Sequence, residues 1–170
     1  IDDQAGNSIV RMKALARRLK AEKGLDFVVV DYLQLMTTSK SYDSMVNQVT
    51  EISRSLKSLA KEIDVPVLAL SQLNRSVETR GGKPRLSDLR DSGSIEQDAD
   101  VVMFLHSEDR GKDEADKTSI TEVLIEKHRN GPIGKVELYF DLKTTTFLNL
   151  EKSSMSEFAP KKVSGDLDEF

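Results

Sequence analysis

The sequence predicts an α/β fold in which a mostly parallel sheet is flanked by helices and followed by a carboxyl-terminal β-hairpin. Two helix-forming segments alternate with two short apolar runs, which is the order expected when helices cover a parallel sheet. A third apolar run follows at residues 100–105. Beyond it, two strand-forming segments are joined by residues 130–134, Asn-Gly-Pro-Ile-Gly, a composition typical of a hairpin turn.

The first helix is expected to begin after Asn7 or Ser8 and to end at Gly24, because apolar residues recur between them at three- and four-residue steps. The second is expected over about residues 43–62. The apolar runs that follow, at residues 27–30 and 67–70, predict buried parallel strands. Three more strands are expected at residues 121–126, 135–140 and 146–150. Loops are expected at residues 37–44, 75–94 and 107–118, the second of them mobile.

Composition excludes several classes of protein. The chain has 170 residues, which suits one domain, and we expect residues 1–150 to fold and residues 151–170 to form a flexible tail. No apolar run approaches the roughly 20 residues that span a bilayer. The absence of cysteine excludes disulfides and cysteine nucleophiles and fits the cytoplasm. The net charge of −4 means that any nucleic-acid site has to be local. Because the chain begins with Ile1, we expect it to be a piece of a longer protein.

Asp31 directly follows the apolar run at residues 27–30. A carboxylate at the carboxyl end of a parallel strand faces the crevice in which open α/β sheets bind ligands. Four apolar residues followed by an acid form the Walker B pattern, in which the acid helps to hold Mg²⁺, usually through water. The alternative is an acid that simply begins a loop. Ser71 and Gln72 follow the next run. A glutamine at this position can form a hydrogen bond with a terminal phosphate. The alternative is a polar residue at the point where the chain leaves the strand.

Two cationic segments are candidates for anion binding. Residues 75–90 carry five cations against two acids and include two glycines, so this stretch can follow a phosphate backbone or be a solvated loop. Lys127 and Arg129 alternate at the end of a strand and therefore share a face. Two adjacent cations favour an anion beside them, as an arginine finger requires, although the end of a surface strand would have the same pattern.

Four blocks taken together resemble the bacterial replicative DNA helicases of the DnaB family, in order and approximate spacing. The blocks are residues 29–36 (VVDYLQLM), 69–75 (ALSQLNR), 86–100 (LSDLRDSGSIEQDAD) and 127–132 (KHRNGP). The third block is the most specific because it is long. The resemblance covers about residues 1–150. It implies a RecA-like motor domain, truncated at its amino-terminal side, from a homohexameric ring that hydrolyses ATP with Mg²⁺ and unwinds DNA while moving along a single strand.

The resemblance also implies roles for individual residues. Asp31 would be the acid on the Mg²⁺ side, and Gln72 would couple the γ-phosphate to the DNA loops. Lys127 and Arg129 would reach the phosphates bound by the adjacent subunit, with Arg129 as the finger. The residues implied at the DNA backbone are Arg90, Asp91 and Gly93. Primase and a helicase loader are the implied protein partners.

One departure from the family pattern is that no segment matches the phosphate loop Gly-x-x-x-x-Gly-Lys-Ser/Thr. We therefore expect this chain alone not to hydrolyse ATP. Two alternatives stay open at this point: a RecA-like ATPase that is not a helicase, and a non-catalytic module that binds DNA or a ring.

Overall fold

The structure is a computed structural model that describes residues 1–4, 6–38, 42–107 and 120–150. The chain divides into two compact units, the first comprising Ile1–Val102 and Glu126–Ile133, the second Met103–Ile125 and Gly134–Phe170. Every residue singled out above for chemistry belongs to the first unit. The tail expected at residues 151–170 and most of the loop expected at residues 107–118 lie outside the described residues.

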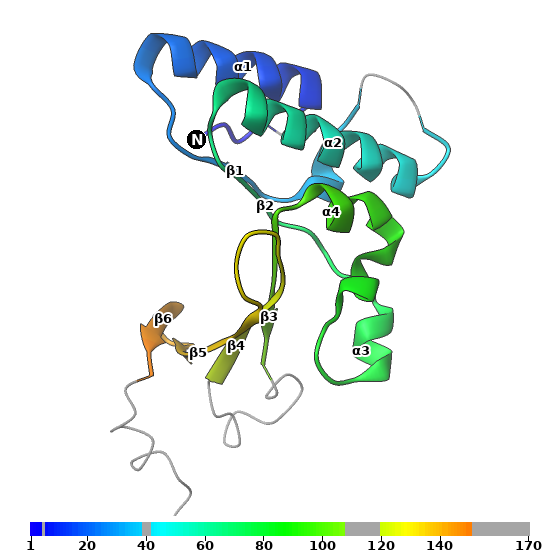
Figure 1. Cartoon of the computed structure of the whole chain (residues 1–170), viewed down its shortest axis with the longest axis vertical. Coiled ribbons are helices and arrows are strands. Elements are labelled where there is room, and N and C mark those ends of the chain that lie inside the picture. The colour runs from blue at the N-terminus through cyan, green and yellow to red at the C-terminus, as the bar shows by residue number, and fades with distance from the viewer. Residues whose placement is uncertain (5, 39–41, 108–119, 151–170) are drawn as a thin grey trace, which may run out of the picture. The chain divides into compact units, whose positions relative to one another are not determined.

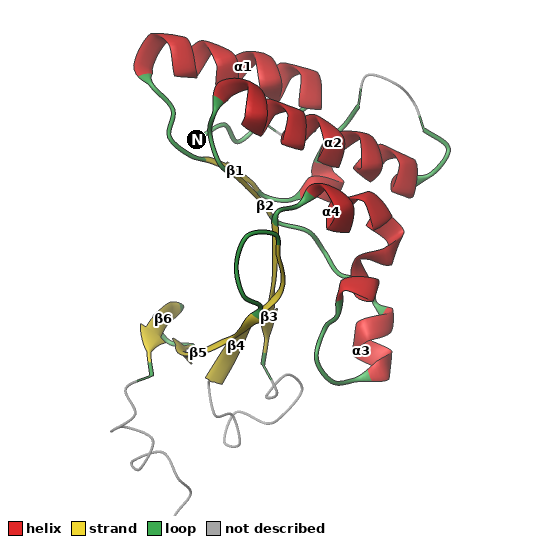
Figure 2. Ribbon diagram, in the orientation of Figure 1, coloured by secondary structure: helices red, strands yellow, loops and turns green. Residues whose placement is uncertain are grey.

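Two long helices form as the sequence predicts (Figures 1 and 2). Helix α1 spans Ile9–Lys23, capped by the Ser8 hydroxyl, which accepts a hydrogen bond from the Arg11 N–H at 3.2 Å. It ends at Gly24, whose φ of 78° is a conformation that glycine adopts without strain. Helix α2 spans Met45–Ile63 and packs against α1. No helix in the described part of the chain is both long and apolar enough to cross a membrane.

Strands β1 (Val28–Val30) and β2 (Val67–Ala69) pair in parallel, which confirms the predicted pairing. A short 3₁₀ helix, η1 (Leu33–Leu35), follows β1. Val28 and Val30 face a core that also contains Ile9 of α1, Leu33 of η1, Met36 directly after η1, and Ile52 and Leu56 of α2. This arrangement ties the β1 end to both helices.

The expectation that these strands are buried on both faces is wrong. Val29 and its β2 partner Leu68 are 57% and 37% exposed. The residues that pack against the pair lie on the side of Val28 and Val30, so only one face is covered within the described chain. A continuous apolar run does not by itself distinguish these two cases.

Helix α2 places one apolar stripe on the core, and its centre is Ile52, which is fully buried. We expect Ile52→Ala to lower the free energy of unfolding by about 2–5 kcal/mol, because the removed atoms leave a cavity. Val46→Ala is the matched control, since Val46 is 39% exposed on the same helix, and should change stability by no more than about 0.5 kcal/mol. Urea unfolding of the two variants measures the difference. Equal effects would contradict this core assignment.

The polar segment at residues 75–94 is helical over most of its length, so the expectation of a mobile loop is wrong. It contains α3 (Ser76–Arg80), η2 (Leu86–Ser92) and the start of α4 (Gly93–Asp98). Elements η2 and α4 contact one another, and both contact α2. Order here comes from these contacts and from the ion pair of Arg80 with the buried Asp88, neither of which leaves a periodic pattern in the sequence.

The remaining strands form a second sheet in the order β3 (Val101–His106), β4 (Ile120–His128), β5 (Gly134–Asp141) and β6 (Thr146–Asn149). Strands β4 and β5 are antiparallel, as are β5 and β6, which confirms the predicted hairpin. Glu122 and Glu137 lie directly opposite each other, a repulsive arrangement. The Lys135 ammonium offsets it by bonding both carboxylates, at 3.0 and 2.7 Å, and they raise the pKa of Lys135.

Candidate functional site

The carboxyl ends of β1 and β2 meet at one edge of the parallel pair. The Val30 carbonyl accepts a hydrogen bond from the Leu70 N–H at 2.9 Å, and the Leu70 carbonyl accepts one from the Leu33 N–H at 3.0 Å. Asp31 lies between these two links and is exposed. The site residues expected after the two strands are therefore brought to the same edge, as the rule for parallel strands predicts.

The side chain of Gln34 joins the two strand ends. Its amide nitrogen donates to the Ser71 hydroxyl at 3.0 Å and to the Gln72 carbonyl at 3.4 Å, while its amide oxygen accepts from the Gln72 N–H at 3.3 Å. Gln72 itself is exposed at this edge. The backbone on both sides of Gln72 is thus fixed by a residue of η1.

Asp88 forms hydrogen bonds with the chain that follows Gln72. The Asn74 N–H donates to the Asp88 carbonyl at 3.2 Å. The Asp88 side chain, 4% exposed, accepts both arms of the Arg80 guanidinium at 2.8 Å and the Arg85 N–H at 2.7 Å. The Arg80 guanidinium beside it lowers the pKa of Asp88 below its usual range. A buried carboxylate needs such a full set of donors, and the bidentate geometry makes the Arg80–Asp88 pair a strong local link.

The residues expected to contact DNA follow immediately. We call residues 90–93 the contact segment, and its backbone forms the end of η2 and the first residue of α4. The side chains of Arg90 and Asp91 lie outside what the structure describes, so the role of Arg90, Asp91 and Gly93 stays a prediction. Of the five cations in residues 75–90, Arg80 is held by Asp88, whereas Arg75, Lys83 and Arg85 are exposed.

Lys127 and Arg129 reach the carboxyl end of α4. The Lys127 ammonium donates to the Glu96 carbonyl at 2.5 Å, and the Arg129 guanidinium donates to the Gln97 carbonyl at 3.2 Å. These carbonyls lie in the last turn of a helix, where acceptors lack intrahelical partners and cations are favoured. The two cations therefore act on the same side of their strand, as alternation predicts.

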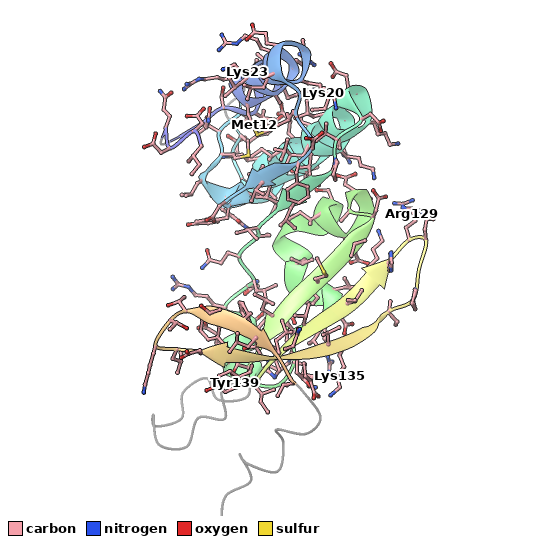
Figure 3. The ribbon with its side chains drawn as sticks, turned by 90° about the vertical axis from the view of Figure 1, so that its left-hand side faces the viewer. Met12, Lys20, Lys23, Arg129, Lys135 and Tyr139 are labelled. Atoms are coloured by element: carbon pink, nitrogen blue, oxygen red, sulfur yellow. The ribbon has the colours of Figure 1, made fainter. Side chains whose placement is uncertain are left out.

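Asp100 holds the candidate finger in a second way. Its carboxylate lies 3.1 Å from Nε of Arg129 and also bonds Lys57 of α2, and the Arg129 N–H donates to the Asp100 carbonyl at 2.8 Å. The pKa of Asp100 is lowered mainly by its hydrogen bond with Lys57. The positive charges of Arg129 and Lys127 lower it further. The Arg129 side chain is still 52% exposed. Arg129, which is labelled in Figure 3, is oriented by its own chain yet open to a ligand.

Arg129 and Asp31 belong to opposite ends of the parallel strands. Arg129 lines an open polar hollow of about 690 Å³ together with Val65 and Pro66, which precede β2. Asp31 and Gln72 follow β1 and β2. Asp31 and Arg129 both stay outside the core.

The family model for the DnaB-like helicase C terminal domain matches residues 1–149. The chain belongs to this family. Among similar proteins, the replicative DNA helicase DnaB of Geobacillus stearothermophilus is 50% identical over 154 residues, covering 89% of this chain and 34% of the relative. The replicative DNA helicase DnaC of Bacillus subtilis (strain 168) gives the same identity and coverage. The chain thus spans about a third of the length of the DnaB relatives that it matches.

Solved structures of DnaB-like proteins have the same fold. One structure, described as an ATPase domain, matches with a TM-score of 0.81 at 47% identity, covering 88% of this chain and 54% of that one. A second, described as a DnaB-like replicative helicase and its interactions with primase, matches with a TM-score of 0.82 at 47% identity, covering 89% and 37%. These matches confirm the expected fold class, that of the helicase ATPase domain.

Asp31 is the acid that would help to hold a Mg²⁺ at this edge, mainly through water. Among the described residues, no group of three or more histidine, aspartate or glutamate side chains could hold a metal. Asp31 offers a single exposed carboxylate. Mg²⁺ prefers oxygen ligands and retains several waters, so one carboxylate at an open DnaB-like strand edge suits it.

Sequence reasoning missed three groups that organise this DnaB-like site. Gln34 lies in one of the blocks that carry the resemblance, but its hydrogen bond with Gln72 joins residues 38 positions apart and forms only in the folded chain. In the sequence, Asp88 is only one acid in a cationic segment, and Asp100 only begins an apolar run. The one available signal was position, since all three lie inside the blocks that resemble the family.

Proposed function

We propose that this chain is the carboxyl-terminal part of the motor domain of a replicative DNA helicase. The complete protein would form a homohexameric ring in the cytoplasm, hydrolyse ATP with Mg²⁺, move along single-stranded DNA and unwind the duplex. Family membership over residues 1–149 carries this proposal. We further propose that residues 1–150 belong to the ATPase domain and that residues 151–170 are a tail. Primase is proposed as a partner because one similar structure is described with it, and a loader by analogy with the family.

The placement of the charged groups supports a nucleotide site shared between subunits. In this proposal Asp31 acts on the Mg²⁺ side of one nucleotide, and Gln72 contacts its terminal phosphate. Lys127 and Arg129 act on the nucleotide of the neighbouring subunit, which is supported by the position of Arg129 beside Val65 and Pro66 at the other end of β2. The bound Mg²⁺ would neutralise charge on the transferred phosphate. Arg90, Asp91 and Gly93 are proposed to contact the DNA backbone.

The decisive experiment is strand separation by the full-length protein on a forked duplex with a single-stranded tail. We expect separation that requires ATP. Hydrolysis without separation would favour a non-helicase ATPase, and DNA binding without either activity would favour a non-catalytic module. The isolated 170-residue chain should hydrolyse no ATP, because it carries no phosphate loop. Turnover by this chain that disappears in Asp31→Ala would contradict the assignment.

A further inference from the structure

The path along the chain from Gln72 to the contact segment is long, but the path through hydrogen bonds is short. Asn74 comes two residues after Gln72, and Asp88 comes two residues before Arg90. The Asn74 N–H donates to the Asp88 carbonyl at 3.2 Å. A displacement of Gln72 can therefore reach the contact segment without passing around the intervening residues.

The Arg80–Asp88 pair makes this crossing rigid. The Asp88 carboxylate receives three hydrogen bonds between 2.7 and 2.8 Å, two from the Arg80 guanidinium and one from the Arg85 N–H. These bonds join the last residue of α3, the chain before η2, and η2 itself. Arg80 also donates to the Lys83 carbonyl at 3.2 Å. Because the carboxylate is almost fully buried and accepts these three bonds, it cross-links the segment between Asn74 and Asp88.

The nucleotide end of the path is equally connected. Gln34 holds the backbone of Gln72 through both of its amide atoms, and it lies three residues after Asp31. Hydrogen-bond networks and rigid short elements of this kind are what can carry coupling between two sites, provided that the coupling is measured.

We propose that the Arg80–Asp88 pair is a positioning device that carries a change at Gln72 to the contact segment. Neither residue contacts nucleotide or DNA in this role. The inference rests on the proposed helicase function, because it presupposes that DNA and ATP act on one another through this chain. It assigns to an ion pair with a buried carboxylate the task of making DNA binding and hydrolysis depend on each other.

Electrostatics alone predicts a different result for one of the variants, a change in DNA affinity without a loss of the response of hydrolysis to DNA. Asp88→Asn removes a negative charge next to a segment that binds a polyanion, so a purely electrostatic effect would strengthen DNA binding. If the pair positions the contact segment, the same variant weakens the response of hydrolysis to DNA. Arg80→Lys keeps the positive charge but loses the two-armed geometry, and it should act in the same direction as Asp88→Asn.

The test uses the full-length protein and a single-stranded thymidine oligonucleotide. ATP hydrolysis is measured with and without the oligonucleotide, and fluorescence anisotropy gives its affinity in the presence of ADP and of a non-hydrolysable ATP analogue. In Asp88→Asn and Arg80→Lys we expect the ratio of stimulated to basal rate to fall about tenfold, the scale of one lost hydrogen bond to a charged group. The difference in DNA affinity between the two nucleotide states should shrink in parallel.

Glu62→Gln is the matched control. It breaks the Arg17–Glu62 pair, which is also two-armed, with bonds of 2.5 and 2.8 Å between α1 and α2. We expect it to leave the stimulation ratio and the basal rate unchanged. Thermal unfolding of all three variants separates a loss of coupling from a loss of folding.

Three outcomes would overturn the inference. The first is wild-type stimulation in both Asp88→Asn and Arg80→Lys. The second is a proportional loss of basal and stimulated rates together with a lower melting temperature, which would make the pair purely structural. The third is a wild-type protein that shows no hydrolysis or no response to DNA, which would overturn the proposed function as well and is recognised from the wild type alone.

Discussion

Replacement of Arg129 by alanine in the full-length protein should lower the rate of ATP hydrolysis about a thousandfold or more, the effect of removing an arginine finger. The guanidinium is half exposed and is oriented by Asp100 and by the end of α4, so it can be inserted into a neighbouring site with little loss of side-chain freedom. Arg129 lies beside the residues that precede β2, whereas Asp31 and Gln72 follow β1 and β2. This separation is the reason to expect that Arg129 acts on the neighbour's nucleotide.

The same variant should stay folded. The Arg129–Asp100 pair is exposed at both ends, and exposed ion pairs contribute about 0–1 kcal/mol. Steady-state hydrolysis and thermal unfolding of Arg129→Ala measure the two effects separately. Arg17→Ala is the matched control, because Arg17 is a similarly exposed arginine paired with Glu62 away from the site, and its hydrolysis should stay normal.

Rings of mixed composition test whether the finger acts between subunits. If each active site needs Arg129 from its neighbour, adding Arg129→Ala subunits to wild type should reduce hydrolysis faster than in proportion to their fraction. A linear decrease would indicate independent sites. Normal turnover by the pure variant would remove Arg129 from the catalytic assignment altogether.

The elements that could be predicted from the sequence are those whose signal is local. Ser8 and Gly24 mark the ends of α1 because capping depends on nearby backbone groups. The turn at residues 130–134 marks the β4–β5 hairpin for the same reason. The order in residues 75–94 could not be predicted, because it depends on Asp88 meeting Arg80 and on contacts with α2.

The candidate site divides in the same way. The proximity of Asp31 and Gln72 follows from a general rule about parallel strands, so the sequence was enough to predict it. The residues that orient Gln72 and Arg129 were not predictable, because Gln34 meets Gln72 and Asp100 meets Lys57 and Arg129 only in the folded chain. Burial on one face of β1 rather than two also required the packing of the helices to be known.

Asp31→Asn in the full-length protein should lower Mg²⁺-dependent ATP hydrolysis by roughly a hundredfold or more, since a positioned metal supplies several kcal/mol of charge stabilisation in the transition state. Asparagine keeps the size of the side chain and removes the charge that favours the hydrated ion. The Asp31 side chain is exposed at the strand end, so the fold should be unaffected.

The matched control for this variant is Asp26→Asn, because Asp26 is an exposed acid that precedes β1 instead of following it. Hydrolysis measured over a range of Mg²⁺ concentrations should show a weaker Mg²⁺ dependence and a lower maximum rate for Asp31→Asn, and a wild-type curve for Asp26→Asn. If Asp31→Asn gives the wild-type curve, the metal-side role belongs to another residue. If both variants lose activity equally, the effect is one of general charge rather than of position, because only Asp31 lies at the edge that Gln72 shares.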